Sequence, residues 1–252
     1  MRITRILAPN AGPFTGPGTN SYVVESSGHA VIIDPGPMIG SHLGAIRDAV
    51  AALRVVGILV THHHQDHAPA ANPLAAEFSV PSYGFGNFGG FQAISPVADG
   101  EGIHVGTKMI EVLHTPGHTP DSLTFAVGSV LFTGDTIKAG STVVVDDMAA
   151  YLATLDRLAA RAPEIIYPGH GDRIDDPAAV LADYIAHRRA REEQVLGVLE
   201  REPRSAEAIV ALVYPELERA LMPLATQSTT AHLHKLAAEG RATRSDDGWS
   251  RP

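Results

Sequence analysis

The stretch that decides the fold, residues 55–67, reads VVGILVTHHHQDH, and its first six residues form a continuous apolar run typical of a β-strand buried on both faces. The run ends at a string of four His and one Asp, and functional sites commonly lie at this carboxyl end of a strand. From a loop, His62 and His64 can converge on one cation. Asp66 and His67 can face a second. Imidazole and carboxylate groups suit zinc, iron or manganese, with zinc the usual choice for a tetrahedral site.

Three later stretches place another candidate ligand directly after a strand-like run, at a turn that contains glycine. They read HTPGHTP at 114–120, FTGD at 132–135 and YPGH at 167–170. A polyhistidine surface run is the ordinary alternative for the string at 62–67 taken alone. Four His and an Asp within six residues, followed by three more ligand-capable turns, favour a metal site instead.

The composition excludes several classes of protein. Hydrophobic residues make up 44% of the 252 residues and charged residues 19%, so the chain can bury a core and is not disordered. It has no Cys, which excludes disulfides, thiolate zinc ligands and a cysteine nucleophile. The net charge of −9 argues against broad nucleic-acid binding. No apolar run reaches the roughly 18 residues of a membrane span, and the N-terminus lacks a signal-peptide pattern, so we expect a cytoplasmic protein without a membrane partner.

The order of the expected elements indicates a layered α/β architecture. Apolar periodicity predicts helices at 41–53 and 147–160 and strands at 22–24, 30–33, 55–60, 109–113, 122–132 and 165–167. The glycine-rich stretch 81–102 has no clear period and is interpreted as a loop or lid. We divide the chain into a main domain, a linking helix and a C-terminal region of short helices and a small hairpin, at 1–176, 177–203 and 204–252.

With these motifs in this order, the chain resembles the metallo-β-lactamase superfamily, whose signature is HxHxDH followed by His, Asp and His. The match spans residues 34–170 and keeps every motif in order. The resemblance implies an αββα sandwich with two metal ions between the upper edges of two sheets, and it makes 1–176 a metallo-β-lactamase-fold hydrolase domain. It implies that the first metal is bound by His62, His64 and His118. The second metal would be bound by Asp66, His67 and His170, and Asp135 would bridge the two metals.

The same resemblance bears on residues beside the ligands. Asp34 fits the early structural Asp of the family, which orients the metal loop from behind the ligands. His63 departs from the aromatic or small residue usual between the first two ligands, and we expect it not to bind metal. His114 is expected to be structural. His232 and His234 are two apart on an expected helix, so they face diverging directions and form no ligand pair. No role is assigned to the isolated His29, His42, His104 and His187.

The chemistry follows from two adjacent cations, for which we expect two zinc ions per chain, with iron or manganese as alternatives. A water shared by two such ions has its pKa lowered from about 15.7 towards about 7, which gives a bridging hydroxide at neutral pH. Asp66 is the expected catalytic residue, because it would orient that hydroxide. No serine elbow, phosphate-binding glycine loop or dinucleotide fingerprint competes with this metal-assisted hydrolysis.

Asp135 limits the reactions that the family resemblance allows, because true lactamases of the superfamily carry Cys or Ser at that position. We therefore expect weak or promiscuous β-lactamase activity at most. Three flanking stretches resemble the β-lactamase-like protein 2 group, namely TGPGTNSY at 15–22, STVV at 141–144 and HRRARE at 187–192. That resemblance implies a winged-helix-like region at 204–252 and an ester-type or phosphodiester substrate, and one branch of the group cuts single-stranded RNA.

Three other interpretations stay open. A glyoxalase II-like thioesterase would share the full ligand set, although we find no basic cluster for glutathione in this sequence. A metal-dependent sensor with a DNA-reading tail is disfavoured by five basic against six acidic residues in 205–252. A mononuclear iron dioxygenase would use only His62, His118 and Asp135 and leave four ligands idle. The expected partners are a small-molecule ester, a thioester or single-stranded RNA, and a homo-oligomer of this chain also stays open.

Overall fold

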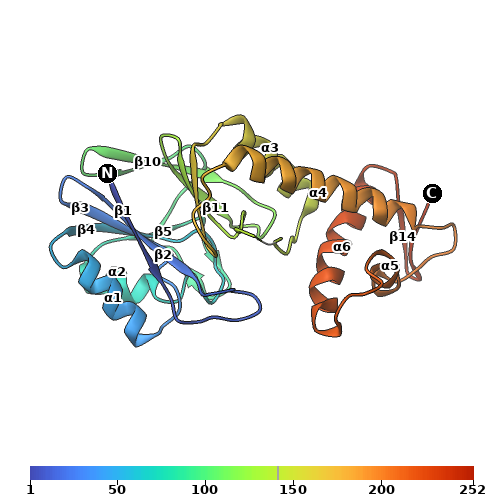
Figure 1. Ribbon diagram of the computed structural model, residues 1–252, viewed down its shortest axis with the longest axis horizontal. Coiled ribbons are helices and arrows are strands. Elements are labelled where there is room, and N and C mark those ends of the chain that lie inside the picture. Colours follow the sequence, from blue (N-terminus) through green and yellow to red (C-terminus); the bar gives the residue numbers. More distant parts are fainter. Residues whose placement is uncertain (141) are drawn as a thin grey trace. The chain divides into compact units, whose positions relative to one another are not determined.

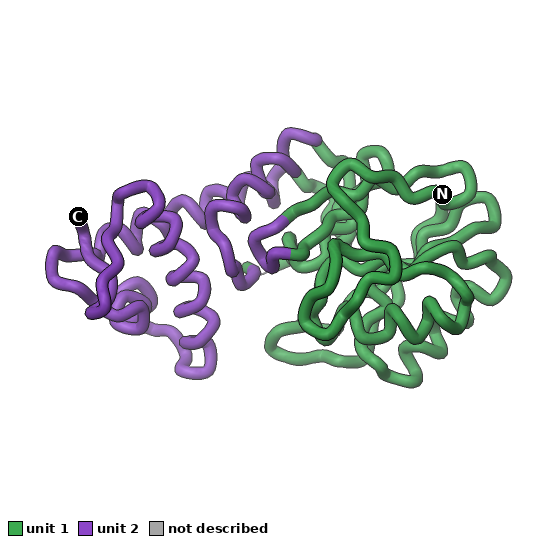
Figure 2. Tube along the Cα trace, turned by 180° about the vertical axis from the view of Figure 1, so that it is seen from behind, with its two compact units in different colours: residues 1–115, 121–142, 162–177 green, residues 116–120, 143–161, 178–252 purple. Residues whose placement is uncertain are grey.

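The structure is a computed structural model that describes residues 1–140 and 142–252 (Figure 1). The described residues form two compact units, each of which joins several stretches of the chain (Figure 2). Unit 1 consists of Met1–Thr115, Asp121–Thr142 and Ala162–Pro177. Unit 2 consists of Pro116–Pro120, Val143–Arg161 and Ala178–Pro252. Ser141, part of the flanking stretch 141–144, lies outside the described residues. The domain limits given above stay a prediction.

The first sheet of unit 1 has six strands in the order β1-β2-β3-β4-β5-β8. They are β1 (Arg2–Leu7), β2 (Asn20–Ser26), β3 (His29–Ile33), β4 (Arg54–Leu59), β5 (Ser82–Gly84) and β8 (Ser95–Pro96). From β1 to β3 the neighbours are antiparallel, and from β3 to β8 they are parallel. Parallel neighbours need a crossover, which α1 (Gly40–Val50) and α2 (Ala71–Phe78) provide on either side of β4. The carboxyl ends of β3 and β4 therefore lie at the same edge.

The second sheet of unit 1 has five strands in the order β13-β12-β11-β10-β9. They are β9 (Gly102–Val105), β10 (Lys108–His114), β11 (Leu123–Val127), β12 (Val130–Gly134) and β13 (Ile165–Pro168). The first four pair antiparallel in sequence order, whereas β13 lies parallel to β12. It follows that β10, β12 and β13 all run in one direction, so the three glycine-containing turns that follow them begin at one edge of the sheet.

Buried side chains of the first sheet alternate between two cores, as the two-residue period of a strand requires. Val23 packs in one core with residues of α1 and α2, such as Ile46. Its neighbour Val24 packs in the other core with residues of the second sheet, such as Phe125. Figure 1 shows α1 and α2 together beside the first sheet. This helix–sheet–sheet arrangement confirms the layered α/β architecture that the sequence predicts.

The stretch 81–102, which the sequence analysis interprets as a loop or lid, contains short strands. β5 and β8 extend the first sheet, and β6 (Asn87–Phe88) pairs with β7 (Phe91–Gln92) in a small hairpin. Phe91 is buried in the core beneath α2. Strands of two or three residues are too short to show a period, so hydrophobic patterning does not detect them. Nor does it predict β1, β9 or α2.

Unit 2 is mainly helical. It contains α3 (Met148–Ala160), α4 (Pro177–Gly197, from Ala178 onward), α5 (Ala206–Val213), the 3₁₀ helix η1 (Arg219–Leu221), α6 (Met222–Ala238) and the hairpin of β14 (Thr243–Ser245) and β15 (Gly248–Ser250). Its core joins α4, α5, α6 and the hairpin through apolar side chains such as Val195, Leu233 and Trp249. The long helix, the short helices and the terminal hairpin are confirmed. Among the described residues, no helix is both long and apolar enough to span a membrane.

His232 of α6 is buried among charged groups of unit 2. Burial lowers the pKa of His232 to about 3, and the cations of Arg188, Lys235 and Arg191 add to the shift. The carboxylate of Glu192 lies 3.5 Å from Nδ1 of His232, but the same carboxylate is already paired with Lys235 at 2.8 Å. The folded protein therefore keeps His232 neutral.

This neutral histidine predicts a loss of stability in acid. The unfolded chain protonates His232 near its ordinary pKa of 6.5, whereas the folded chain does so only near 3, so the free energy of unfolding falls as the pH drops through this window. The slope approaches about 1.4 kcal/mol per pH unit. We expect His232→Gln to lose less stability than wild type between pH 6.5 and about 4.5 in urea denaturation. The matched control is His234→Gln, an exposed position on the same helix, which should follow wild type. The prediction would be contradicted if the free energy of unfolding fell with pH equally in wild type and His232→Gln.

Candidate metal centre

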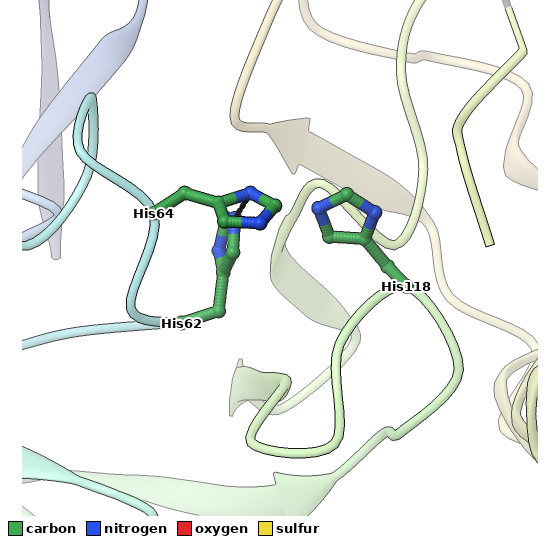
Figure 3. Close-up of side chains that lie close together, drawn as sticks. All are labelled: His62, His64 and His118. Atoms are coloured by element: carbon green, nitrogen blue, oxygen red, sulfur yellow. Dashed lines mark hydrogen bonds between the residues drawn. The ribbon is translucent and has the colours of Figure 1, made fainter. Parts of the chain in front are cut away.

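The seven expected ligands fall into three groups, and within each group the candidate ligand atoms lie within 4.8 Å of one another. We name them the first group (His62, His64, His118), the linking group (His62, His67, Asp135) and the second group (Asp66, His67, His170). Figure 3 shows the first group, with His62 and His64 on the loop after β4 and the ring of His118 turned towards them. Because the linking group shares a histidine with each of the others, the three groups form one cluster.

Four of the histidines have Nδ1 beside an oxygen atom. The pairs are His62 with Thr61 Oγ1 at 3.0 Å, His67 with Asp34 Oδ2 at 2.9 Å, His118 with Val144 O at 2.7 Å and His170 with Gly18 O at 3.1 Å. Carbonyl and carboxylate oxygens only accept, so Nδ1 donates in the last three pairs and Nε2 keeps its lone pair for a metal. His64 differs, because its Nδ1 lies 2.9 Å from Nε2 of His62. These two nitrogens face the same point, which suits a shared cation.

Asp34 holds the ligand loop from the end of β3. Its buried carboxylate accepts hydrogen bonds from Thr61 N and Thr61 Oγ1, each at 2.7 Å, and from His67 Nδ1 at 2.9 Å. Its φ of 48° lies in the left-handed region, which Asp tolerates better than most residues. The parallel pairing of β3 with β4 brings Asp34 and Thr61 to one edge. These contacts agree with the structural role expected for Asp34.

The loop before β2 makes contacts that the sequence analysis does not predict. Thr19 donates from Oγ1 to Asp66 Oδ2 at 2.8 Å, and Asn10 donates from Nδ2 to Thr19 Oγ1 at 2.9 Å. Asn20 donates from Nδ2 to two backbone oxygens in the turn around His170, at 3.0 and 2.8 Å. The loop therefore orients Asp66, and the first residue of β2 holds the turn that carries His170. The only signal in the sequence is the polar run TGPGTNSY at 15–22, which leads into this strand.

Two histidines near the cluster belong to none of its groups. His63 lies 2.8 Å through Nδ1 from Asp121 Oδ1, and its backbone N–H donates to Asp121 Oδ2 at 2.9 Å. Asp121, which the sequence analysis does not single out, thus ties the middle of the histidine string to the start of β11. His114 at the end of β10 stacks on Phe85, with ring centroids 3.9 Å apart and planes 6° from parallel. Both histidines have structural contacts in keeping with their expected roles.

Burial and opposite charge act against each other in the cluster. Burial alone would raise the pKa values of Asp66 and Asp135, but His67 and His170 bring both below their ordinary value. Burial alone would lower the pKa values of these two histidines, but the two carboxylates raise both. The histidine Nε2 atoms lie 3.2 to 3.4 Å from the carboxylate oxygens. The centre of the cluster therefore favours positive charge.

The donors present fit a metal ion. Nε2 of His67 is buried and lies 3.3 and 3.4 Å from oxygens of Asp66 and Asp135, without a well-formed hydrogen bond to either. Atoms in this arrangement could share a metal ion. Five imidazoles and two carboxylates make a nitrogen and oxygen set suited to zinc, iron or manganese. The glycine at 169 lets the backbone pass close to two of these ligands. A Cβ at that position would lie 2.5 Å from Asp135 Oδ1 and 2.8 Å from His67 Cε1.

Comparison with known proteins supplies the family. A family model described as the metallo-beta-lactamase superfamily matches residues 14–93 and 92–170, which hold the seven ligands. The chain belongs to the metallo-beta-lactamase superfamily. A second model, the beta-lactamase associated winged helix domain, matches residues 205–249. The predicted metallo-β-lactamase fold with a winged-helix-like C-terminal region is thereby confirmed, and this superfamily member is a metal-dependent hydrolase.

Similar proteins span most of the chain. A beta-lactamase-like protein 2 homolog of Drosophila melanogaster is 31% identical over 95% of this chain and 89% of its own length. An atrochrysone carboxyl ACP thioesterase of Aspergillus chevalieri is 34% identical over 82% of this chain and 68% of its own. A solved beta-lactamase domain protein from Burkholderia ambifaria has a TM-score of 0.84 at 24% identity, over 100% of this chain and 91% of its own. A metallo-beta-lactamase family protein from Thermus thermophilus has a TM-score of 0.82 at 23% identity, over 99% and 98%. At these identities the two structures show the shared fold.

The contacts of Asp34 predict a large loss of stability on truncation. Asp34→Ala leaves three buried donors without an acceptor, so we expect the free energy of unfolding to fall by about 3 kcal/mol or more. We also expect fewer bound metal ions per chain, because His67 loses its orienting partner. Urea denaturation and elemental analysis measure the two effects. Asp172→Ala, which removes an exposed carboxylate paired with Arg5, should change neither. Full stability and full metal content in Asp34→Ala would refute this role.

The tight contact at Gly169 predicts a defect confined to the metal site. Gly169→Ala should push Asp135 and His67 apart and weaken metal binding by about 10-fold or more, as disturbance of groups that orient ligands typically does. Gly44→Ala is the matched control, because no atom lies within 4 Å of its new Cβ on α1. Competition with a chromophoric chelator measures both affinities. Equal affinities in the two variants would show that Asp135 does not need this space.

Proposed function

We propose that the protein is a dinuclear zinc hydrolase that cleaves an ester-type bond, with an acyl thioester as the first candidate substrate. The observation that carries the proposal is the joining of the first and second groups through the linking group. Asp135 lies 3.4 Å from His67 Nε2 and 3.2 Å from His170 Nε2, and it shares a group with His62. One carboxylate can therefore serve two ions. We propose the cytoplasm as the compartment, because a chain without cysteines needs no oxidising environment.

Asp66 is the carboxylate placed to orient the attacking water. Two bound zinc ions would supply an acidified water and polarise a carbonyl or phosphoryl oxygen. The side chain of Asp66 is 25% exposed against 9% for Asp135, so it is the one that water and substrate reach. The hydroxyl of Thr19 fixes the orientation of its Oδ2. We accordingly propose that Asp66 would orient the attacking water, and its lowered pKa keeps the carboxylate ionised for that role.

An aromatic strip beside the ligand loop supports an acyl substrate. His63, next in sequence to two ligands, has its ring 6.2 Å from Phe88 in a stacked arrangement. Phe88 lies 6.3 Å from Phe85, which stacks on His114. These rings offer apolar surface, which suits an acyl chain better than a charged polymer. A protein named as an atrochrysone carboxyl ACP thioesterase is 34% identical to this chain, which also favours thioester hydrolysis.

Single-stranded RNA is the second candidate substrate. The similarity to beta-lactamase-like protein 2 homologs covers more of both chains than the similarity to the thioesterases. The winged-helix match at 205–249 also fits a nucleic-acid hypothesis. Against it, the residues from 205 to 252 carry five basic and six acidic side chains, which gives no net attraction for phosphates. The thioester therefore ranks first.

We expect the zinc-loaded protein to hydrolyse a medium-chain acyl thioester of N-acetylcysteamine. Asp135→Ala should lower kcat/KM by about a hundredfold or more, because it removes the carboxylate shared by the two ions. Asp172→Ala is the matched control and should behave as wild type, since its carboxylate is exposed and pairs with Arg5. Thiol release measured with a chromogenic reagent reports the rate.

The same protein samples are tested with end-labelled single-stranded RNA, a glutathione thioester and nitrocefin. Cleavage of RNA by wild type but not by Asp135→Ala, without thioester turnover, would replace the first candidate with the second. Turnover of nitrocefin at the rate of a dedicated lactamase would overturn the expectation of weak or promiscuous β-lactamase activity at most. Chelation should abolish all activity, and zinc should restore it. Full activity in metal-free protein would overturn the whole proposal.

A further inference from the structure

The segment from Val143 to Asp147 has no role in the mechanism above, yet it touches the loop that carries His118. Nδ1 of His118 donates to the carbonyl oxygen of Val144 at 2.7 Å. Because a carbonyl oxygen only accepts, this contact places the proton on Nδ1 and leaves Nε2 as the ligand atom. The backbone N–H groups of Asp146 and Asp147 donate to the carbonyl of Gly117 at 2.8 and 3.1 Å. The segment and the His118 loop are thus joined by three hydrogen bonds.

Arg188 of α4 holds this segment from the other side. Its Nη2 donates to the carbonyl oxygen of Val143 at 2.6 Å, next to the carbonyl that binds His118. The residue is 3% exposed, and its guanidinium lies 5.3 Å from the ring centroid of Tyr151. A buried, charge-assisted hydrogen bond of this length is among the stronger polar contacts in a protein. Arg188 therefore fixes the position of the Val143 carbonyl.

The helix α6 adds two more contacts to the same segment. Gln227 donates from Nε2 to Asp146 Oδ1 at 2.5 Å, and the backbone N–H of Val145 donates to Ser228 Oγ at 3.4 Å. The segment is further confined at Gly117, where a Cβ would lie 2.4 Å from the Cα of Tyr151. Consecutive residues of the segment are thus held by α4 and α6, which belong to the same compact unit as His118.

We propose that Arg188 is a positioning residue for the metal ligand His118, and that it acts through the backbone of Val143 and Val144. Gln227 and Ser228 reinforce the same segment, so the C-terminal helices determine the direction and tautomer of one imidazole of the first group. The inference rests on metal binding by that group. It gives the helical C-terminal region a function in the hydrolase site that needs no nucleic acid.

The test compares Arg188→Met with Arg188→Lys and with Arg189→Met. Met keeps much of the volume of Arg188 but cannot donate to Val143, whereas Lys keeps a charged donor. Arg189 is the matched control, because it is exposed on the same helix and lies 3.9 Å from Asp156. Competitive zinc titration measures two affinities per chain, and cobalt substitution reports the ligand geometry through its visible spectrum. Nitrogen-15 NMR of the metal-free protein reports the tautomer of His118.

We expect Arg188→Met to weaken one of the two zinc affinities by about 10- to 100-fold, the usual effect of removing support for a ligand, and to leave the other unchanged. Its cobalt spectrum should change, and His118 should show a mixture of tautomers. Arg188→Lys should recover part of each property. Arg189→Met should match wild type in all of them.

The inference would be overturned if folded Arg188→Met bound both zinc ions as tightly as wild type and kept His118 entirely in the Nδ1–H tautomer. Equal weakening of both zinc sites would also overturn it, because that pattern reports general destabilisation. If Arg188→Met does not fold, Gln227→Ala tests the inference instead. It removes only the exposed hydrogen bond from Gln227 to Asp146. It should weaken the same single site by about 2- to 5-fold, in keeping with one lost hydrogen bond. Wild-type protein that binds no zinc would refute the proposed function, whereas the tautomer of metal-free His118 would still test the positioning role.

Discussion

The carboxylate of Asp34 is the group on which the ligand loop depends. It lies at the end of β3, is buried, and accepts three hydrogen bonds through two oxygens. Two of the donors belong to Thr61, the residue that starts the loop, and the third belongs to His67 near its end. A buried carboxylate is costly unless its oxygens are paired, so these donors are bound tightly to one point. The loop between them is short, and its geometry is therefore largely determined.

The centre of the site could be predicted from the sequence because its signals are local. The apolar run of 55–60 ends at the histidine string, and both the buried strand and the ligand types are visible within thirteen residues. The three glycine-containing turns follow strands that show ordinary apolar patterns. The complete ligand set came from the order of these motifs, which matches the signature of the superfamily. The parallel pairing of β12 with β13, which brings Asp135 and His170 to one edge, was not predicted.

Apart from Asp34, which the family resemblance indicates, the groups that orient the ligands could not be predicted, because their contacts join distant parts of the chain. Thr19 reaches Asp66 across 47 positions, and Asn20 reaches the His170 turn across about 150. Their residue types are ordinary for a polar loop, and nothing in the local sequence indicates a distant partner. The strands between 82 and 96 could not be predicted for another reason. Each is too short to show a two-residue hydrophobic period.

The imidazoles of the cluster are held by two kinds of oxygen, and this difference determines which substitutions can disturb them. Thr61 and Asp34 offer side-chain oxygens, which a single substitution removes. Gly18 and Val144 offer backbone carbonyls, which every residue has, so changes of side chain there act only by moving the backbone. At Gly18 that movement is unavoidable, because its φ is 141° and a Cβ would lie 2.1 Å from the carbonyl oxygen of Ala8. At Val144 the backbone is held by neighbouring side chains instead. The orientation of His118 therefore depends on residues far along the chain, such as Arg188 and Gln227.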